Sequence, residues 1–217
     1  MRRKLNRIEH VLWDWNGTLI DDAEYCSKII AGLLYKHGLR ELSFEEYRDY
    51  FCFPVERFYE KLGLKGRGVS FEETSKSFIE EYEKGWKDCF LHNNAEYILK
   101  EFYNLGIKQS IITAGDKRLI GNYVSHFGIS HYFESLVGTE NILAAGKIEA
   151  ARRYVSNAGL DGSNVVVIGD TLHDAEVAKE IGADILLYAN GHNSELRLSL
   201  SNAVIIKDLG EVSGYVK

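Results

Sequence analysis

Short apolar runs alternate with amphipathic segments along the second half of the chain. The runs occupy residues 107–112, 135–137, 165–168 and 185–188, with a further candidate at 204–206. Because these runs are almost continuously apolar, they predict buried strands of a parallel sheet that is covered on both faces. Residues 8–13 form another such run near the start of the chain and predict one more strand of the same sheet.

Helical patterns lie between the apolar runs, at residues 95–105, 116–127, 147–158 and 174–181. Three of them are followed by a glycine and then an apolar or small residue, at Gly128-Ile129, Gly159-Leu160 and Gly182-Ala183. That pairing is typical of a left-handed helix end with an apolar contact behind it. This alternation of strands and helices predicts right-handed crossovers and an α/β fold with a doubly wound, Rossmann-like parallel sheet.

Residues 21–92 differ from the rest because their pattern is helical and contains no convincing strand. Ser43 and Glu46, like Ser70 and Glu73, have the spacing of a capping box, in which the serine and glutamate satisfy free amides at a helix start. An all-helical segment that interrupts an α/β domain after its first strand predicts an inserted cap. We therefore expect a catalytic core from residues 1–19 and 93–217 and a helical cap domain from residues 20–92.

Composition narrows the possible partners and location. The 217 residues are 45% hydrophobic, enough for a large core, and the formal net charge is −6, which argues against a nucleic-acid partner. No apolar run has the length of a bilayer span, so we expect no membrane partner. The three cysteines have no Cys-x-x-Cys spacing, which favours free, buried thiols in a reducing cytoplasm. The oligomeric state stays open.

Acidic residues follow two of the predicted strands. Asp14 comes directly after the first strand, Asp170 follows the strand at 165–168, and Asp174 lies four residues further on. Parallel strands present their carboxyl ends at one edge, where ligands bind in such sheets. Together the three acids favour a magnesium site, because magnesium prefers carboxylate oxygens, water and phosphate. Taken singly, Asp14 also fits a turn that closes its strand, and Asp170 and Asp174 fit helix capping.

Two further groups are candidates for binding a phosphate. Thr113, Ala114 and Gly115 follow the strand at 107–112 and offer a hydroxyl and backbone amides. Lys147 stands at a predicted helix start, where a positive charge is unfavourable unless an anionic site is nearby. Alone, the first group also fits a simple helix cap, and Lys147 also fits a solvated surface lysine.

In order and spacing, these four groups resemble the motifs of the haloacid dehalogenase-like hydrolase superfamily. Residues 14–18 match its Asp-x-Asp-x-Thr motif except that Asn16 replaces the second aspartate, and residues 169–174 match its Gly-Asp-x-x-x-Asp motif in full. Thr113 and Lys147 match the two motifs between them. The resemblance covers nearly the whole chain, including the helical cap, and is greatest to the branch of phosphoglycolate-phosphatase type.

The resemblance implies a phosphatase that cleaves a small phosphorylated metabolite through an aspartyl-phosphate on Asp14. Mg²⁺ would be held by Asp14, the Asn16 carbonyl and Asp170, with Asp174 in support. Thr113 and Lys147, with the amides of Ala114 and Gly115, would bind the phosphoryl oxygens. The cap would select the leaving group, with Arg57 and Lys61 as possible substrate-facing cations.

Asn16 is the departure from the family pattern. The aspartate at this position serves family phosphatases as general acid and base, and an amide cannot exchange a proton usefully near neutral pH. His173 is a candidate substitute. Two alternatives follow: a 2-haloacid dehalogenase-type hydrolase, and a catalytically weak module that binds phosphorylated ligands. The first is disfavoured because those members need no magnesium, whereas Asp170 and Asp174 are both present here.

Overall fold

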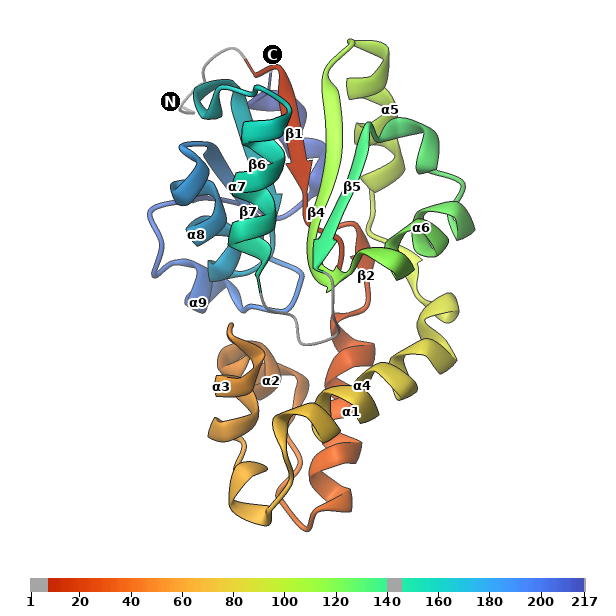
Figure 1. The fold of residues 1–217 in the computed structure, drawn as a ribbon, viewed down its shortest axis with the longest axis vertical. Helices are drawn as coiled ribbons and strands as arrows, with labels where there is room; N and C mark the ends of the chain where they lie inside the picture. Colours follow the sequence, from red (N-terminus) through yellow and green to blue (C-terminus); the bar gives the residue numbers. More distant parts are fainter. Residues whose placement is uncertain (1–7, 140–145, 217) are drawn as a thin grey trace.

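A six-stranded parallel sheet forms the centre of the protein, as a computed structural model of the chain shows for residues 8–139 and 146–216 (Figure 1). Its strands are β1 (His10–Trp13), β4 (Lys108–Asp116), β5 (Ser135–Thr139), β6 (Val165–Gly169), β7 (Asp184–Tyr188) and β8 (Val204–Ile206). They lie in the order β5-β4-β1-β6-β7-β8. The predicted doubly wound α/β fold is confirmed, including the pairing of residues 204–206.

Each face of the sheet is covered by helices, because successive side chains of a buried strand point to opposite faces. Leu12 packs with α7 (Lys147–Asn157) and α8 (Leu172–Ile181). Its neighbours Val11 and Trp13 pack on the other face with α5 (Ala95–Asn104) and α6 (Lys117–His126). The strand β1 pairs with β4 on one side and β6 on the other, so the residues that follow it lie at the middle of the sheet edge.

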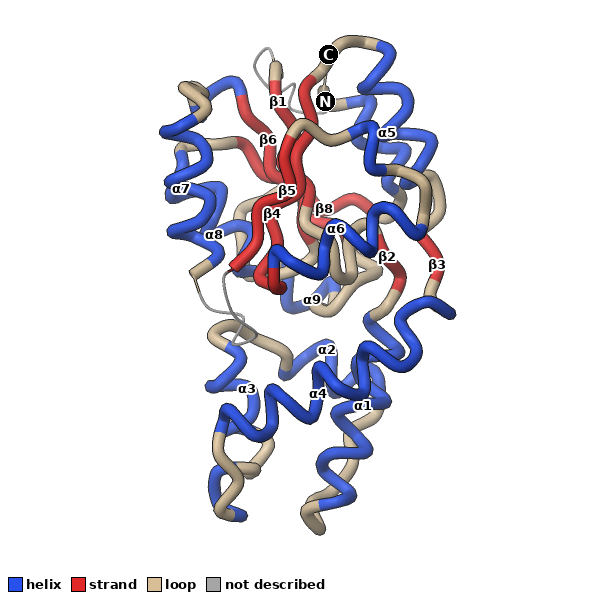
Figure 2. Tube along the Cα trace, turned by 45° about the vertical axis from the view of Figure 1, so that its right-hand side comes forward, coloured by secondary structure: helices blue, strands red, loops and turns tan. Residues whose placement is uncertain are grey.

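The segment after β1 forms a separate helical lobe below the sheet (Figure 2). Its helices are α1 (Ala23–Lys36), α2 (Phe44–Tyr50), α3 (Val55–Lys61) and α4 (Phe71–Gly85). Both predicted capping boxes are present: Ser43 with Glu46 opens α2, and Ser70 with Glu73 opens α4. Along the described stretches, no helix is long and apolar enough to cross a membrane.

A two-stranded ribbon connects the lobe to the core, and the sequence did not predict it. The strands β2 (Ile20–Asp21) and β3 (Phe90–Leu91) pair antiparallel, with Ile20 opposite Leu91. The expectation of helices alone over residues 21–92 was therefore wrong at its two ends. Two-residue strands carry too few positions to show an alternating pattern, which is why periodicity missed them.

Some element ends and one short helix also differ from expectation. The strand β4 continues through residues 113–116, although a turn was expected after Thr113 and a helix from Asp116, and its register with β5 shifts between Ile112 and Asp116. The helix α8 begins at Leu172 rather than at Asp174, and α9 (Glu195–Leu198) was not predicted. Among the cysteines, Cys26 is buried as expected, but Cys52 and Cys89 are only half-buried.

Arg48 fastens the cap to the core. Its guanidinium, on α2, donates hydrogen bonds to the carbonyls of Gly191 at 2.8 Å and Asn193 at 3.0 Å, and also to that of Ala189. In return, the Asn193 side chain donates to the carbonyl of Phe51 at 2.9 Å. These bonds hold the cap against the loop that follows β7, at the same edge of the sheet as Asp14.

Candidate active site

Lys147 joins two of the acids that the sequence singled out. Asp14 follows β1, and its backbone N–H donates to the carbonyl of Ile168 at 2.8 Å. Lys147 is the first residue of α7, and its Nζ lies 2.7 Å from Asp14 Oδ1 and 2.6 Å from Asp174 Oδ1. All three side chains are buried. Lys147 is therefore not a surface lysine, because its ammonium bridges two carboxylates inside the protein.

The pKa values of this trio differ for physical reasons. Burial would lower the pKa of Lys147, but the carboxylates of Asp14 and Asp174 outweigh burial and raise it. Burial would raise the pKa of Asp174, yet Lys147 and the hydrogen bonds from Thr171 hold it below its usual value. Burial raises the pKa of Asp14 well above its usual value in spite of Lys147, because Asp174 and Asp170 add repulsion. Asp14 therefore sits in an excess of negative charge that a cation would relieve.

Asp170 completes a cluster of three buried carboxylates. Its Oδ1 accepts a hydrogen bond from the Thr18 hydroxyl at 2.8 Å, and its Oδ2 accepts one from the His192 amide at 2.6 Å. Burial raises the pKa of Asp170 to about 6. One oxygen from each of Asp14, Asp170 and Asp174 lies within 4.8 Å of the others. Three neighbouring carboxylates, two of which share Lys147, form an oxygen donor set that fits a hard divalent cation such as magnesium.

Glycines allow the loops around Asp170 to approach closely. A Cβ atom at Gly17 or at Gly191 would collide with the Asp170 carboxylate, and Gly17 also has a φ of +73°, which favours glycine. The loop after β1 and the loop after β7 therefore close directly over Asp170. This packing explains why the acid is completely buried although it stands at a strand end.

Thr113, Ala114 and Gly115 line the same cavity as Asp14, but within β4 rather than in a turn. The Gly115 amide is not free, because it donates to the Thr113 hydroxyl oxygen at 3.0 Å. The hydroxyl can still donate its own proton, since a hydroxyl both accepts and donates. Of this group, Thr113 is thus the stronger candidate for a phosphate oxygen, and Gly115 contributes space.

Asn16 belongs to a hydrogen-bonded network that the sequence did not reveal. Its Nδ2 lies 2.6 Å from Asp22 Oδ2 and 2.9 Å from the Tyr82 hydroxyl, and Tyr82 donates to the same Asp22 oxygen at 2.8 Å. His192 Nε2 lies 3.5 Å from Asp22 Oδ1. These bonds offset burial and lower the pKa of Asp22, whereas burial of His192 is outweighed by Asp22 and Asp170, which raise the pKa of the imidazole.

A usable signal for part of this network was present in the sequence. His192 lies in Asn190-Gly191-His192-Asn193, a polar turn directly after the strand at 185–188. This turn follows a strand of the sheet, as Asp14 and Asp170 do, so His192 could have been predicted at the same edge of the sheet. Tyr82 carried no signal, because it is one of several aromatic residues on a helix of the cap.

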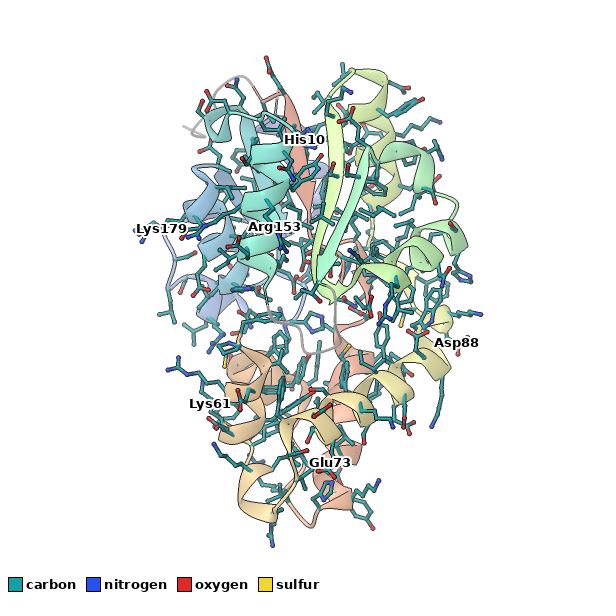
Figure 3. All side chains as sticks on the ribbon, in the orientation of Figure 1. His10, Lys61, Glu73, Asp88, Arg153 and Lys179 are labelled. Carbon is teal, nitrogen blue, oxygen red and sulfur yellow. The ribbon has the colours of Figure 1, made fainter. Side chains whose placement is uncertain are left out.

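Three other suggested residues lie elsewhere. His173 stacks on Phe53, with ring centroids 4.6 Å apart, and its Nδ1 lies 2.8 Å from Glu176 Oε2. It is not among the described residues that line the cavity, and neither are Arg57 and Lys61. Lys61 lies at the outer margin of the cap (Figure 3), with its ammonium 3.3 Å from Cys52 Sγ. His192, rather than His173, is the histidine that lines the cavity with Asp14.

The cavity lies between the core and the cap and has a volume of about 150 Å³. Asp14, Thr113 and Lys147 lie on its core side, and aromatic side chains from α2, α3 and α4 line its cap side. A buried carboxylate paired with a lysine, beside further acids at the carboxyl ends of parallel strands, is an arrangement typical of hydrolases that act on anionic substrates.

Comparison with known proteins agrees with this class. Residues 11–188 match the family model of the haloacid dehalogenase-like hydrolases, and the chain belongs to this family. A phosphoglycolate phosphatase of Rhodobacter capsulatus is 21% identical, covering 95% of this chain and 96% of that protein. One of Neisseria meningitidis is 22% identical, covering 98% and 95% of the two chains. The protein is accordingly a phosphatase of this family.

Solved structures share its fold. A haloacid dehalogenase-like protein of Streptococcus pneumoniae superposes with a TM-score of 0.79 at 18% identity, covering 96% of this chain and 98% of that one. A Rhodobacter sphaeroides protein crystallised with xylulose-1,5-bisphosphate superposes with a TM-score of 0.71 at 17% identity, covering 97% and 100% of the two chains. At these identities the likeness concerns the fold alone.

Proposed function

We propose that this phosphatase is magnesium-dependent and cleaves a small phosphorylated metabolite through an aspartyl-phosphate on Asp14. The observation that carries the proposal is the contact of Lys147 with both Asp14 and Asp174, beside the carboxylate of Asp170. A lysine held in this way can neutralise a phosphoryl group next to the attacking carboxylate. Three free cysteines fit a protein of the reducing cytoplasm.

The reaction divides one displacement into two. A carboxylate oxygen of Asp14 forms a bond to phosphorus as the bond from phosphorus to the leaving oxygen breaks, and that oxygen takes up a proton. Water then attacks the same phosphorus, loses a proton and releases inorganic phosphate, which restores Asp14. Throughout, Lys147 and the Thr113 hydroxyl stabilise charge on the phosphoryl oxygens.

Asp14, Asp170 and the Asn16 carbonyl would hold the magnesium ion, with Asp174 in support. When bound, the ion offsets the repulsion between the attacking carboxylate and the phosphate. The Asn16 side chain does not act as an acid in this proposal. Its amide donates to Asp22 and Tyr82, and thus positions the loop that carries Gly17 and Thr18. The comparisons do not favour the dehalogenase or the catalytically weak binding module, since the two relatives named above are phosphatases.

Two variants test the proposal against a matched control. We expect Asp14→Asn to abolish magnesium-dependent phosphate release from a panel of sugar, acyl and alkyl phosphates. We expect Asp170→Ala to abolish both that activity and the binding of magnesium measured by isothermal titration calorimetry. The control is Asp88→Ala, which removes an exposed carboxylate at the outer margin of the molecule (Figure 3). Unchanged magnesium affinity in Asp170→Ala, or unchanged activity in Asp14→Asn, would contradict the proposal.

A further inference from the structure

The cap side of the active-site cavity is apolar. Its cap residues include Phe51, Phe53, Val55, Phe58, Phe78 and Ile79. From the core, Leu119 and Ile120 of α6 meet them. A leaving group attached to a phosphate beside Asp14 would therefore contact hydrocarbon on several sides.

Lys147 is the only lysine or arginine that lines the cavity in the part of the chain that the structure describes. Its ammonium already bridges Asp14 and Asp174, and it faces the phosphate end. Residues 140–145, which precede it in sequence, contain no lysine or arginine. Asp116 adds a further carboxylate to the lining, although Arg118 pairs with it. A second anionic group on the substrate would find no free cation among these residues.

The cap cations nearest in sequence to the apolar wall do not line the cavity. The Arg48 guanidinium donates hydrogen bonds to three backbone carbonyls of the core. Arg57 is exposed and does not line the cavity, and Lys61 contacts Cys52 at the outer margin of the cap. None of these three charges therefore compensates for the apolar lining.

The hydroxyls of Tyr82 and Tyr123 and the imidazole of His192 are engaged by protein groups, whereas Trp15 Nε1, also in the lining, is buried without a hydrogen-bond partner among the described residues. The Tyr82 hydroxyl donates to Asp22, and that of Tyr123 donates to Glu83. His192 has Nδ1 2.8 Å from the Tyr47 hydroxyl and Nε2 3.5 Å from Asp22, so both ring nitrogens face protein groups. The rings of these residues, rather than their polar atoms, are what a ligand would meet.

We propose that the cap side of this cavity selects phosphate monoesters with a small, uncharged and apolar leaving group, no larger than about one ring. The proposal rests on the proposed function, because it assumes that the phosphate lies at Asp14. The whole cavity, phosphate end included, has a volume of roughly 150 Å³. Because an apolar cavity of that size holds a molecule about as large as benzene, one ring is the upper limit for the leaving group. An ionised carboxylate on the leaving group would lose its water in these surroundings and gain no cationic partner among the described lining residues, so we expect the leaving group to be uncharged.

Compounds that carry two anionic groups, such as phosphoglycolate or a sugar bisphosphate, should therefore be poor substrates of this protein. The sharpest comparison uses benzyl phosphate and 4-carboxybenzyl phosphate, which share a benzylic leaving oxygen and differ by one carboxylate. We expect kcat/KM to be at least about 100-fold higher for benzyl phosphate, since every 1.4 kcal/mol of differential binding gives a factor of ten. Phosphoglycolate should be turned over as poorly as the carboxylated ester.

A substitution at Ile79 tests whether the missing cation is the cause. Ile79 lies on α4, is half-buried and lines the cavity, so a long side chain there can direct its end group inward. We expect Ile79→Arg to reduce the preference for benzyl phosphate by at least about tenfold. The matched control Ile79→Gln, which is polar but uncharged, should leave the ratio of the two substrates nearly unchanged.

Two results would overturn the inference: equal or better turnover of 4-carboxybenzyl phosphate or phosphoglycolate by the natural chain, or the same change of ratio in Ile79→Arg and Ile79→Gln. If none of the three esters is hydrolysed, the proposed function fails. The selectivity of the cavity can then still be tested by measuring ligand binding. Calorimetry with benzylphosphonate and 4-carboxybenzylphosphonate, which cannot be hydrolysed, should then show tighter binding of the uncharged ligand. Equal binding of the two phosphonates would refute the inference by itself.

Discussion

In the core half of the active-site cavity, charged groups lie in direct contact, whereas in the cap half, aromatic rings pack against one another. Lys147, Asp14 and Asp174 are buried together within 2.7 Å contacts, and Asp170 holds two hydrogen bonds nearby. In the cap half, Phe51 and Phe58 meet edge to face, with ring centroids 5.2 Å apart. The core half can therefore stabilise the charge of a phosphoryl group, and the cap half can discriminate only by shape and polarity.

The largest expected difference between the halves concerns stability. Lys147→Met would leave Asp14 and Asp174 buried without their shared cation, and breaking a buried ion pair from one side typically costs about 3–5 kcal/mol. We expect urea denaturation to show a loss of that size in the absence of magnesium. The control Lys28→Met breaks an exposed pair with Glu24, at 2.8 Å, and should cost less than about 1 kcal/mol. Equal losses in the two variants would show that the buried contacts contribute little.

How much the sequence could predict also differs between the halves. Asp14 and Asp170 were predicted because strand ends converge in space, so their positions along the chain decide their neighbours. Lys147 was predicted because a lysine at a helix start indicates an anionic site nearby. The cap offered no such rule, and its candidate cations Arg57 and Lys61 turned out to lie off the cavity. Which face of a short helix meets the core depends on the tertiary contacts of Arg48 and Asn193, which no local pattern encodes.

The network around Asn16 shows the same limit within the core. Asp22 and Tyr82 are separated by 60 positions, yet both contact the Asn16 amide. The sequence identified Asn16 as a departure from the family pattern but gave no sign of what its side chain contacts. The positions of these partners follow from how the first turn of α1 and the last turn of α4 pack above the sheet edge.

A second prediction concerns the opposite edge of the sheet, away from the active site. It states how the stability of the protein at this edge depends on pH. His10, at the start of β1, is buried, and burial with the nearby Lys108 lowers its pKa from 6.5 to about 4. Between pH 6.5 and pH 4, His10 therefore binds a proton in the unfolded chain but not in the folded chain. The free energy of unfolding falls as the pH falls through this range. A shift of this size corresponds to about 3 kcal/mol.

Replacement of His10 removes this dependence. We expect the free energy of unfolding of His10→Phe, relative to the natural chain, to rise by about 3 kcal/mol between pH 6.5 and pH 4, in urea titrations without magnesium. The control His131→Gln changes an exposed histidine and should follow the natural chain at every pH. Parallel curves for His10→Phe and the natural chain would mean that the buried imidazole does not titrate on unfolding.

The last prediction concerns Asn16 and Asp22, where sequence and structure give different expectations. From the sequence, Asn16→Asp is a nearly isosteric return to the family pattern. In the structure, it places a second carboxylate where the amide now donates to Asp22 Oδ2 at 2.6 Å. Loss of a charge-assisted hydrogen bond together with like-charge contact should cost about 2 kcal/mol of stability. The exchange Asn16→Asp with Asp22→Asn restores one donor and one acceptor, and the Tyr82 hydroxyl, which contacts both residues, can serve either arrangement. We therefore expect the double variant to recover most of the loss, with a coupling energy of about 1–3 kcal/mol in a double-mutant cycle.

The double variant should also hydrolyse alkyl phosphates at least about tenfold faster than the natural chain, because a general acid at position 16 typically contributes about 10²–10⁴-fold. Thermal and urea denaturation with rapid-quench kinetics on all four proteins measure both effects. Additive stabilities would show that the Asn16–Asp22 contact is energetically neutral, and a double variant no faster than the natural chain would show that the proton already comes from another group.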